Sequence, residues 1–553
     1  MSEQELKLHV PSKVRSAISK ELTQQPVTRV RLHALYFDTP TRALVKARIA
    51  LRLRQEGRKW VQTLKMPGDH PLARIELNHP RPGPSLDLTL YDGTPAAQAL
   101  ASLNEPLGVC YETDVKRMLR TVRTRQGQVE IAFDQGSIRA GSIELPISEV
   151  EFELVSGRVE AIFTLGQRWQ KAFGLIMDAR SKSERGDSLS TLNQTLDQIK
   201  ADTPENIDNI NAKAIAKFWG PRGVQPITLN PQMTVAQALT AVTHECLDQI
   251  IRNAAILAEV DTAGIMQAGR AEHVHQLRVG IRRLRSAWSL FNGLTTLPPI
   301  ELREAIKSHF AKLGGSRDID VLNETILPVL RAAGQPPLVL THEEDADQVP
   351  AHQVVTSNEF QAWILDMVAH TIAPPKTSSP AEKTIGTPTP VVTHGSTTVQ
   401  IVTSQSAASP LVDASKVVAE KPVKELTLKQ ALIGKLKKWH KRVLQEGLKF
   451  EEIDIEARHE LRKRAKRLRY GLQYAESLLP EARLRTYRKQ LANVQDILGE
   501  MNDLAVARER FVVLRDTQPS AWFACGWITS RLEALTHKAA AEFKEFAKAV
   551  HFW

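Results

Sequence analysis

The second half of this 553-residue chain contains an internal repeat, which narrows the folds open to it. HQLRVGIRRLR, which begins at His275, is echoed by HELRKRAKRLR, which begins at His459. A second pair of motifs follows at nearly the same distance: Asp318 in KLGGSRDIDVL lies 43 residues after His275, and Asp503 in ILGEMNDLAVA lies 44 residues after His459. Because both motifs and their separation are preserved, we predict that a whole helical unit is duplicated.

Apolar residues recur at different intervals in the two halves of the chain. Up to about residue 190 they alternate, as in QELKLHV and SEVEFEL, which is typical of strands, with helices expected near residues 11–22 and 158–173. From Val235 to about Ala332, and again from about Leu426, they recur every three or four residues, which is typical of helices. The pattern predicts a multidomain α+β protein in which an all-α domain follows a β domain.

Local composition indicates the domain boundaries. Residues 200–231 are rich in Asn, Asp and Pro, and we interpret them as a linker between a domain at 1–199 and a helical domain at 232–553. Residues 373–420 combine Pro, Ser and Thr with few core-forming side chains. This composition predicts a disordered insertion that interrupts the helical domain.

Charge and cysteine content limit the partners and the compartment. The formal net charge of +11 favours polyanionic partners. The three cysteines are far apart and odd in number, which excludes a disulfide framework and a cysteine-rich metal site and fits a reducing compartment. The N-terminus has no signal-like pattern and no long uncharged apolar run occurs. We therefore expect a cytoplasmic protein without a membrane segment. The oligomeric state is not determined by these features.

The repeated motifs place basic residues on one face of a helix. In each copy the histidine is followed by cations three, seven and ten positions later. This spacing places the four residues on one face of a helix. These two basic stripes consist of His275, Arg278, Arg282 and Arg285 in the first copy and His459, Arg462, Lys466 and Arg469 in the second.

A solvated charged face is the ordinary explanation of such stripes. Solvated faces usually mix acids with bases four residues apart, whereas Glu460 is the only acid in either stretch and lies off the stripe. Because arginine forks suit phosphate oxygens, a linear polyphosphate fits both stripes. Nucleic acid ranks second, since the stripes have few aromatic residues for base stacking and no zinc-finger or RNA-binding signature is present.

The duplicated motif resembles a known family. H-x-x-R-x-x-x-[RK]-R-x-R, followed in each copy by LGxx[RN]D, is similar to the CHAD domain over residues 232–553. The resemblance implies a duplicated helical bundle that binds inorganic polyphosphate, with the eight stripe residues as its contacts. The Pro/Ser/Thr-rich insertion departs from the family's pattern.

Strands of the first half carry charged side chains on one face. Arg52 and Arg54 alternate in one strand, and Glu149, Glu151 and Glu153 alternate in another. A solvated outer face of an antiparallel sheet would explain this pattern. A closed sheet with inward charges is the alternative, in which cations would clamp phosphate oxygens and carboxylates would hold Mg²⁺ or Mn²⁺.

Eight sequence blocks in order favour the second interpretation. EQELK, YFDTP, LRLR, TLK, RIEL, FDQG, EVEFE and SKSERG resemble the CYTH family, the triphosphate tunnel metalloenzymes, across residues 1–190. The resemblance implies an eight-stranded antiparallel β tunnel that binds a triphosphate along its axis. It also implies phosphate-binding roles for Lys7, Arg52, Arg54, Lys65, Arg117 and Lys182.

The resemblance further implies the acidic residues of the site. The expected metal ligands are Glu3, Glu5, Glu149 and Glu151, with Glu153 as an alternative. Glu76 and Asp134 are further tunnel acids, and the candidate catalytic residues are Glu5, Lys7 and Asp134. The expected reaction is Mg²⁺- or Mn²⁺-dependent hydrolysis of inorganic triphosphate to pyrophosphate and phosphate. Thiamine triphosphatase or adenylate cyclase activity in the same tunnel, or a non-catalytic polyphosphate-binding scaffold, are the alternatives.

Overall fold

A computed structural model describes residues 2–68, 73–202, 214–215, 217–261, 271–338, 349–372 and 426–553. Within these ranges only the backbone is described at residues 2–3, 74, 201–202 and 315–320. The predicted insertion at 373–420 lies wholly outside the described residues, and the predicted linker at 200–231 lies partly outside them.

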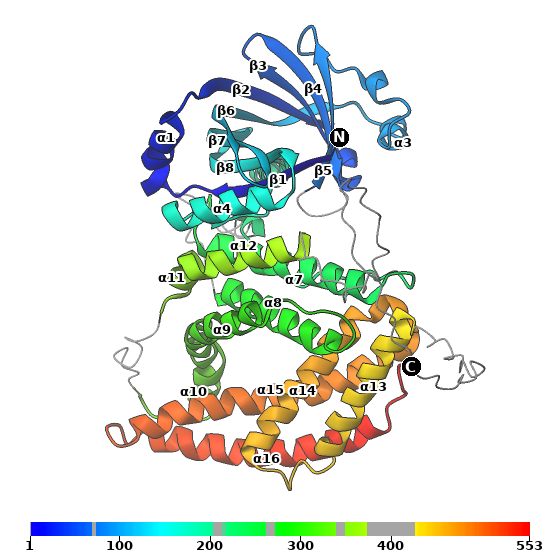
Figure 1. The fold of residues 1–553 in the computed structure, drawn as a ribbon. Helices are drawn as coiled ribbons and strands as arrows, with labels where there is room; N and C mark the ends of the chain where they lie inside the picture. Colours follow the sequence, from blue (N-terminus) through cyan, green and yellow to red (C-terminus); the bar gives the residue numbers. More distant parts are fainter. Residues whose placement is uncertain are drawn as a thin grey trace, which may run out of the picture.

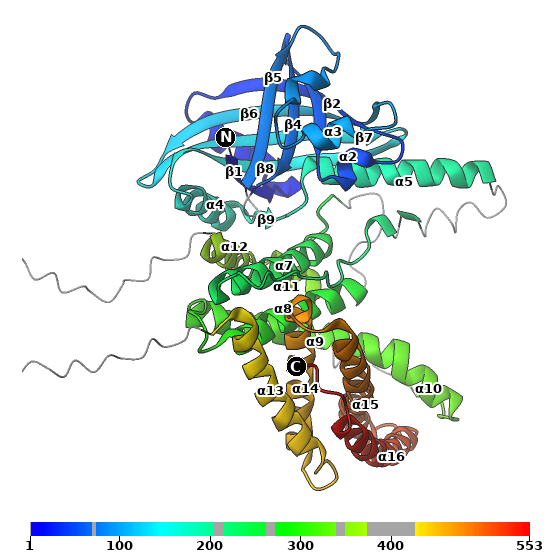
Figure 2. The same cartoon turned by 90° about the vertical axis from the view of Figure 1, so that its right-hand side faces the viewer.

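The first half folds into a sheet that closes on itself (Figures 1 and 2). Its strands are β1 (Ser2–His9), β2 (Thr28–Asp38), β3 (Ala50–Glu56), β4 (Lys59–Pro67), β5 (Ala73–Arg81), β6 (Gly108–Arg123), β7 (Gly127–Ala140) and β8 (Ile143–Gly157). Their order is β5-β4-β3-β2-β6-β7-β8-β1, and an additional β5–β1 pairing closes the ring. All pairings are antiparallel, which confirms the predicted eight-stranded tunnel; the two-residue β9 (Ile176–Met177) also pairs with β1.

Alternation along the strands sends charge inward and apolar groups outward. On β8, Val150 and Phe152 are fully buried in the hydrophobic core, whereas Glu151 and Glu153 line the tunnel cavity. The outward apolar residues are covered by α4 (Glu160–Phe173), whose Trp169 packs edge-on against Phe152. The tunnel is therefore polar inside because its hydrophobic core lies on the outer face of the sheet.

Short helices complete the first half. The helices expected near residues 11–22 and 158–173 correspond to α1 (Arg15–Thr23), preceded by a single 3₁₀ turn, and to α4. The further helices are α2 (Ala43–Lys46), α3 (Ala97–Ala101) and α5 (Lys182–Asp202), the last of which begins at Lys182. No helix was predicted at residues 182–202; Lys182 reaches the tunnel cavity from the start of α5, which packs against β6, β7 and β8.

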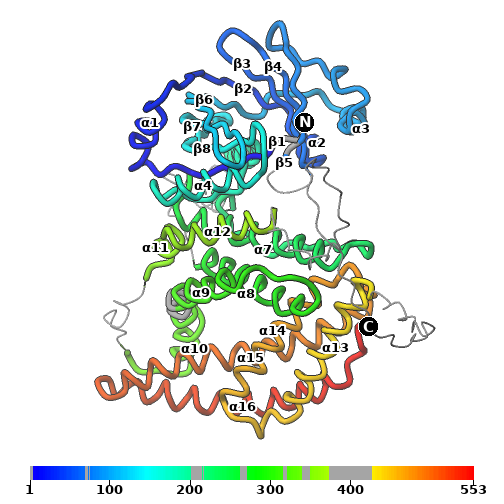
Figure 3. The backbone as a smooth tube through the Cα atoms, in the orientation of Figure 1, coloured from blue at the N-terminus to red at the C-terminus, as the bar shows by residue number. Residues whose placement is uncertain are grey.

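The second half is helical and carries the predicted repeat. Its helices are α7 (Val235–Leu257), α8 (Ala271–Phe291), α9 (Ile300–Val321), α10 (Leu327–Ala332), α11 (Ala351–Thr356), α12 (Asn358–Ile372), α13 (Leu428–Gly447), α14 (Ile455–Tyr474), α15 (Glu481–Leu514) and α16 (Ala521–Ala547). Figure 3 follows the chain through the first copy, α7 to α9, and then the second, α13 to α15. Both copies open with the same capping box, Thr234 with Gln237 and Thr427 with Gln430.

Two helices were missed by the sequence analysis. Helical periodicity was expected to stop near Ala332 and resume near Leu426, but α11 and α12 lie between these positions. α12 buries Phe360, Trp363 and Ile364 and packs between α4 of the first half and α7 of the second (Figures 1 and 2).

The two halves share one hydrophobic core. The same cluster of buried residues contains Leu6 and Phe152 from the tunnel and Ala254 and Ile364 from the helices. Polar contacts cross the junction as well, since the Gln361 side chain accepts a hydrogen bond from the backbone N–H of Met177 at 2.8 Å. The tunnel therefore packs directly against the helical half through a shared core and hydrogen bonds.

Candidate active site

A cavity of about 1120 Å³ is lined by strands of the closed sheet and by residues of α5, α7 and α12. Ten of the twelve predicted tunnel residues line it: Glu5, Lys7, Arg52, Arg54, Lys65, Glu76, Arg117, Asp134, Glu151 and Lys182. Glu149 lies just behind the wall and is 2% exposed. The backbone of Glu3, in β1, pairs with that of Arg74 in β5, but the Glu3 side chain lies outside the described residues.

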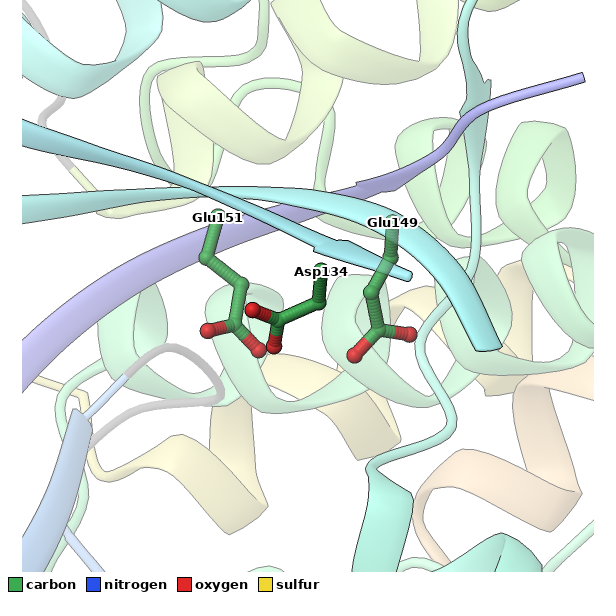
Figure 4. A group of neighbouring side chains, drawn as sticks. All are labelled: Asp134, Glu149 and Glu151. Carbon is green, nitrogen blue, oxygen red and sulfur yellow. The ribbon is translucent and has the colours of Figure 1, made fainter. Parts of the chain in front are cut away.

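Three carboxylates converge on one side of the tunnel. Asp134 on β7 lies directly opposite Glu149 on β8, and Glu151 is two residues further along the same face. One oxygen from each of these carboxylates lies within 4.8 Å of the others (Figure 4). Clustered carboxylate oxygens are the donors that hard divalent cations such as Mg²⁺ and Mn²⁺ prefer.

Two cations lie against this acidic group. Arg117 on β6 donates to both oxygens of Asp134 at 2.6 Å and to Glu151 at 2.5 Å. Lys182 lies 2.7 Å from Asp134 and 2.6 Å from Glu151, and it also contacts Glu149. Acids that would hold a metal and cations that would hold phosphate therefore lie side by side, as a metal–triphosphate site requires.

The charge balance sets the ionisation of the buried acids. Burial opposes ionisation of Glu149, but Arg185, Lys182 and Lys7 hold its pKa well below the usual value. Burial likewise opposes ionisation of Asp134, and Lys182 and Arg117 lower its pKa. Both carboxylates are thus kept in the charged form that a metal needs.

Glu5 behaves differently from these two acids. It lies opposite Glu153 in the β1–β8 pairing, and burial together with the Glu151 charge raises its pKa to about 7. A carboxylate with a pKa near neutrality is suited to accept and release a proton.

A second charged group lies on the opposite wall. Arg52 contacts Glu76 at 3.4 Å and the Tyr36 hydroxyl at 3.4 Å, and Lys65 also pairs with Glu76. Arg54 pairs with Glu56 near the end of β3. The predicted phosphate-binding cations therefore surround the cavity from several strands.

Lys7 lies next to Glu149, one of the three clustered carboxylates. Its ammonium contacts the backbone carbonyl of Arg180 and lies 3.7 Å from Glu149. The structure also brings in Arg185, which donates to Glu149 at 2.5 Å and was not singled out from the sequence. Arg185 lies three residues after Lys182 in the SKSERG block, so the two residues share a face of α5.

The two basic stripes of the helical half lie on helices that pack together, α8 and α14. Burial and the neighbouring charges of Arg282 and Arg462 lower the pKa of Lys466 to about 7. Burial and the charge of Arg467 lower the pKa of Arg285. Cations from both copies therefore crowd one another across the α8–α14 contact.

Residues from α9 support the first stripe. The Arg278 guanidinium lies 4.5 Å from the centre of the Phe310 ring and donates to the Phe310 carbonyl at 3.1 Å. A side chain at Gly314, in the second repeated motif, would come within 3.1 Å of that guanidinium. The second motif therefore leaves room for a stripe arginine.

Not every arginine of the first motif belongs to the stripe. Arg283 is fully buried and pairs with Glu245 at 2.6 Å and Gln249 at 2.7 Å. In the second copy the equivalent position is Arg467, which is exposed. Stripe residue Arg462 lies 4.0 Å from Asp503 of the second repeated motif, and Arg469 donates to Gln495 at 3.3 Å.

Family comparisons agree with this architecture. Residues 1–186 match the CYTH domain and residues 241–512 match the CHAD domain. The chain therefore carries a CYTH domain followed by a CHAD domain, as the sequence motifs predicted. Among the described residues, no helix combines the length and apolar character needed to cross a membrane.

One curated relative is the inorganic triphosphatase of Haemophilus influenzae, which is 33% identical over 192 residues. The match covers 32% of this chain and 53% of the relative, so it spans about half of the relative's length. Among solved structures, the CHAD domain of the plant Ricinus communis is 23% identical, with a TM-score of 0.41 and coverage of 59% of this chain and 96% of that one. A Hippeastrum protein named as an adenylyl cyclase and described as having a dominant triphosphatase activity is 19% identical, with a TM-score of 0.28 and coverage of 34% and 96%.

Proposed function

We propose that the tunnel hydrolyses inorganic triphosphate to pyrophosphate and phosphate with Mg²⁺ or Mn²⁺. The observation that carries the proposal is the convergence of Asp134, Glu149 and Glu151 beside Arg117 and Lys182 at the wall of the cavity. The CYTH match and the named activity of the Haemophilus relative support the same reaction.

The residues present fit a divalent metal. Asp134, Glu149 and Glu151 offer hard oxygen donors, and two of them are held ionised by neighbouring cations. A bound metal would neutralise charge on the phosphate oxygens and lower the pKa of a bound water. Glu5, which the family resemblance implies as a metal ligand, lines the cavity near Glu151, and its raised pKa suits it to accept a proton instead.

The chain's own cations orient the substrate. The tunnel is lined from three strands by Arg52, Lys65 and Arg117. These cations would bind successive phosphate oxygens and so hold the triphosphate in line for attack on its terminal phosphorus. Glu5 accepts a proton from the attacking water. The water oxygen bonds to the terminal phosphorus, the bridging P–O bond breaks, and pyrophosphate leaves.

A substrate panel tests this proposal. The full-length protein is incubated with Mg²⁺ and tripolyphosphate, ATP, thiamine triphosphate or long-chain polyphosphate, and kcat/KM is compared across the panel. We expect tripolyphosphate to be strongly preferred. Equal hydrolysis of every substrate, or none of any, would refute the assignment.

Apolar side chains at the same cavity favour the alternative substrates that carry an organic group. Leu32, Ile251 and Ile372 line it together with the charged residues, so part of the wall would suit a nucleoside or thiazolium group. Preferred turnover of ATP or thiamine triphosphate in the panel would replace inorganic triphosphate by that substrate.

The paired basic stripes are proposed to bind inorganic polyphosphate. This proposal is supported by the close approach of Arg282, Arg462 and Lys466 across the α8–α14 contact. A bound polyanion would relieve the repulsion between these positive charges. The test is polyphosphate affinity after replacement of Arg278, Arg282, Arg462 and Arg469 by Gln, measured at two salt concentrations. Unchanged affinity would show that the stripes are solvated faces, whereas a large loss with a shallower salt dependence is expected.

A further inference from the structure

One arginine connects the acidic group of the tunnel to the helical half. Arg185 donates from Nη2 to Glu149 at 2.5 Å and from Nη1 to Asp261 at 2.6 Å. The side chains of all three residues are at most 3% exposed. Arg185 belongs to α5 of the first half, whereas Asp261 follows α7 of the second half, so a candidate metal ligand is linked to a residue of the other domain.

The position of Asp261 is set by the packing of its neighbours. Val260 is fully buried and packs in a small cluster with Ile176 of β9 and Ala255 of α7. Asp261 itself has a left-handed backbone with φ of 61°. Because β9 pairs with β1, this junction lies directly against the tunnel wall that carries Glu5 and Lys7.

The charges around Glu149 explain why Asp261 matters. Lys182 and Arg185 contact the Glu149 carboxylate and Lys7 lies 3.7 Å from it. One end of the Arg185 fork is held by Asp261, which leaves only the other end for Glu149. Without that partner both ends of the fork would be available to Glu149, and a two-pronged pair would compete with any metal for its oxygens.

We propose that Asp261 of the helical half is a positioning residue that holds Arg185 and thereby leaves the Glu149 carboxylate available to a divalent metal. The inference rests on the proposed function, because it takes the carboxylates of Asp134, Glu149 and Glu151 as the metal site. It assigns the helical half a part in the tunnel's chemistry that is separate from polyphosphate binding.

Asp261→Asn is the test variant. Asn keeps the size of the side chain and adopts left-handed backbone readily, so the substitution removes the charge with little change of shape. Mn²⁺ binding to the full-length protein is titrated by electron paramagnetic resonance, without substrate. We expect the dissociation constant to rise about tenfold, equivalent to about 1.4 kcal/mol. Asp261→Glu, which keeps the charge, should recover most of the affinity.

Asp248→Asn is the matched control. Asp248 also lies on α7 and holds Arg252 at 2.6 Å, and Arg252 pairs across the domain junction with Glu184. This substitution therefore neutralises an acid at the same junction without touching the link to Glu149. We expect it to leave Mn²⁺ affinity unchanged.

The outcomes separate this inference from the proposed function. A wild-type protein that binds Mn²⁺ and hydrolyses tripolyphosphate, combined with unchanged affinity in Asp261→Asn, would overturn the inference alone. Equal weakening in both variants would also overturn it, since the effect would then come from the junction in general. A wild-type protein that binds no Mn²⁺ would overturn the metal site and this inference with it. If thermal unfolding shows that Asp261→Asn is not folded, Asp261→Ser takes its place, with the same expected loss of Mn²⁺ affinity.

Discussion

Arg117 and Asp134 form a two-pronged ion pair inside the tunnel, with both N–O distances at 2.6 Å and the Asp134 side chain fully buried. The same kind of fork occurs between Arg31 and Asp114 on the outside of the sheet, at 2.9 and 2.5 Å. One chain thus offers an inner and an outer copy of the same contact, and only the inner copy adjoins the proposed metal and phosphate sites.

Asp134→Asn should lower triphosphatase kcat by roughly 100-fold, because it removes one acid of the metal group and a partner of Arg117. The measurement is steady-state phosphate release with saturating Mg²⁺. Asp114→Asn breaks the outer fork and should leave kcat unchanged. An equal loss in both variants would mean that the forks act on folding and not on catalysis.

The pH dependence of the reaction follows from Glu5, whose pKa is raised to about 7. Because only the ionised carboxylate accepts a proton, kcat/KM should rise as pH increases through about 7 and then level off. The measurement is a profile of tripolyphosphate hydrolysis from about pH 5.5 to about pH 8.5. A profile that is flat over this range contradicts the assigned role.

Glu5 should also destabilise the folded protein above neutral pH. Its carboxyl pKa is higher in the folded state than the ordinary 4.5, so the folded state binds more protons than the unfolded state between those values, and stability falls as pH rises toward 7. The Glu5→Gln substitution removes this pH-dependent loss of folding stability. Its Tm should exceed that of the wild type at about pH 8, with a smaller gain at about pH 5.

Polyphosphate binding should strengthen as pH falls through about 7, because burial and the charges of Arg282 and Arg462 lower the pKa of Lys466 to that value. Affinities at about pH 6 and about pH 8 measure the effect. Lys466→Arg stays charged at both values and should bind with less pH dependence. Lys463→Arg is the control, since Lys463 is exposed and pairs with Glu460.

The alternation of charged side chains predicted strands with one charged face, and the resemblance of eight sequence blocks to the CYTH family predicted that these strands close into a tunnel with the charges inside. The contact between Arg185 and Asp261 could not be predicted, since these residues are 76 positions apart and belong to different halves. Helix α12 was missed because it adjoins the Pro/Ser/Thr-rich stretch, whose composition dominated the interpretation. The burial of Arg283 also escaped prediction, because its partner Glu245 lies on another helix.

The central claim is that the tunnel hydrolyses inorganic triphosphate with a divalent metal. Phosphorus NMR of the full-length protein with tripolyphosphate tests it most directly, before and after addition of excess EDTA. We predict that Mg²⁺ yields equal amounts of pyrophosphate and orthophosphate and that EDTA stops the reaction. Tripolyphosphate that stays intact with Mg²⁺, or that is hydrolysed at the same rate in EDTA, would contradict the account.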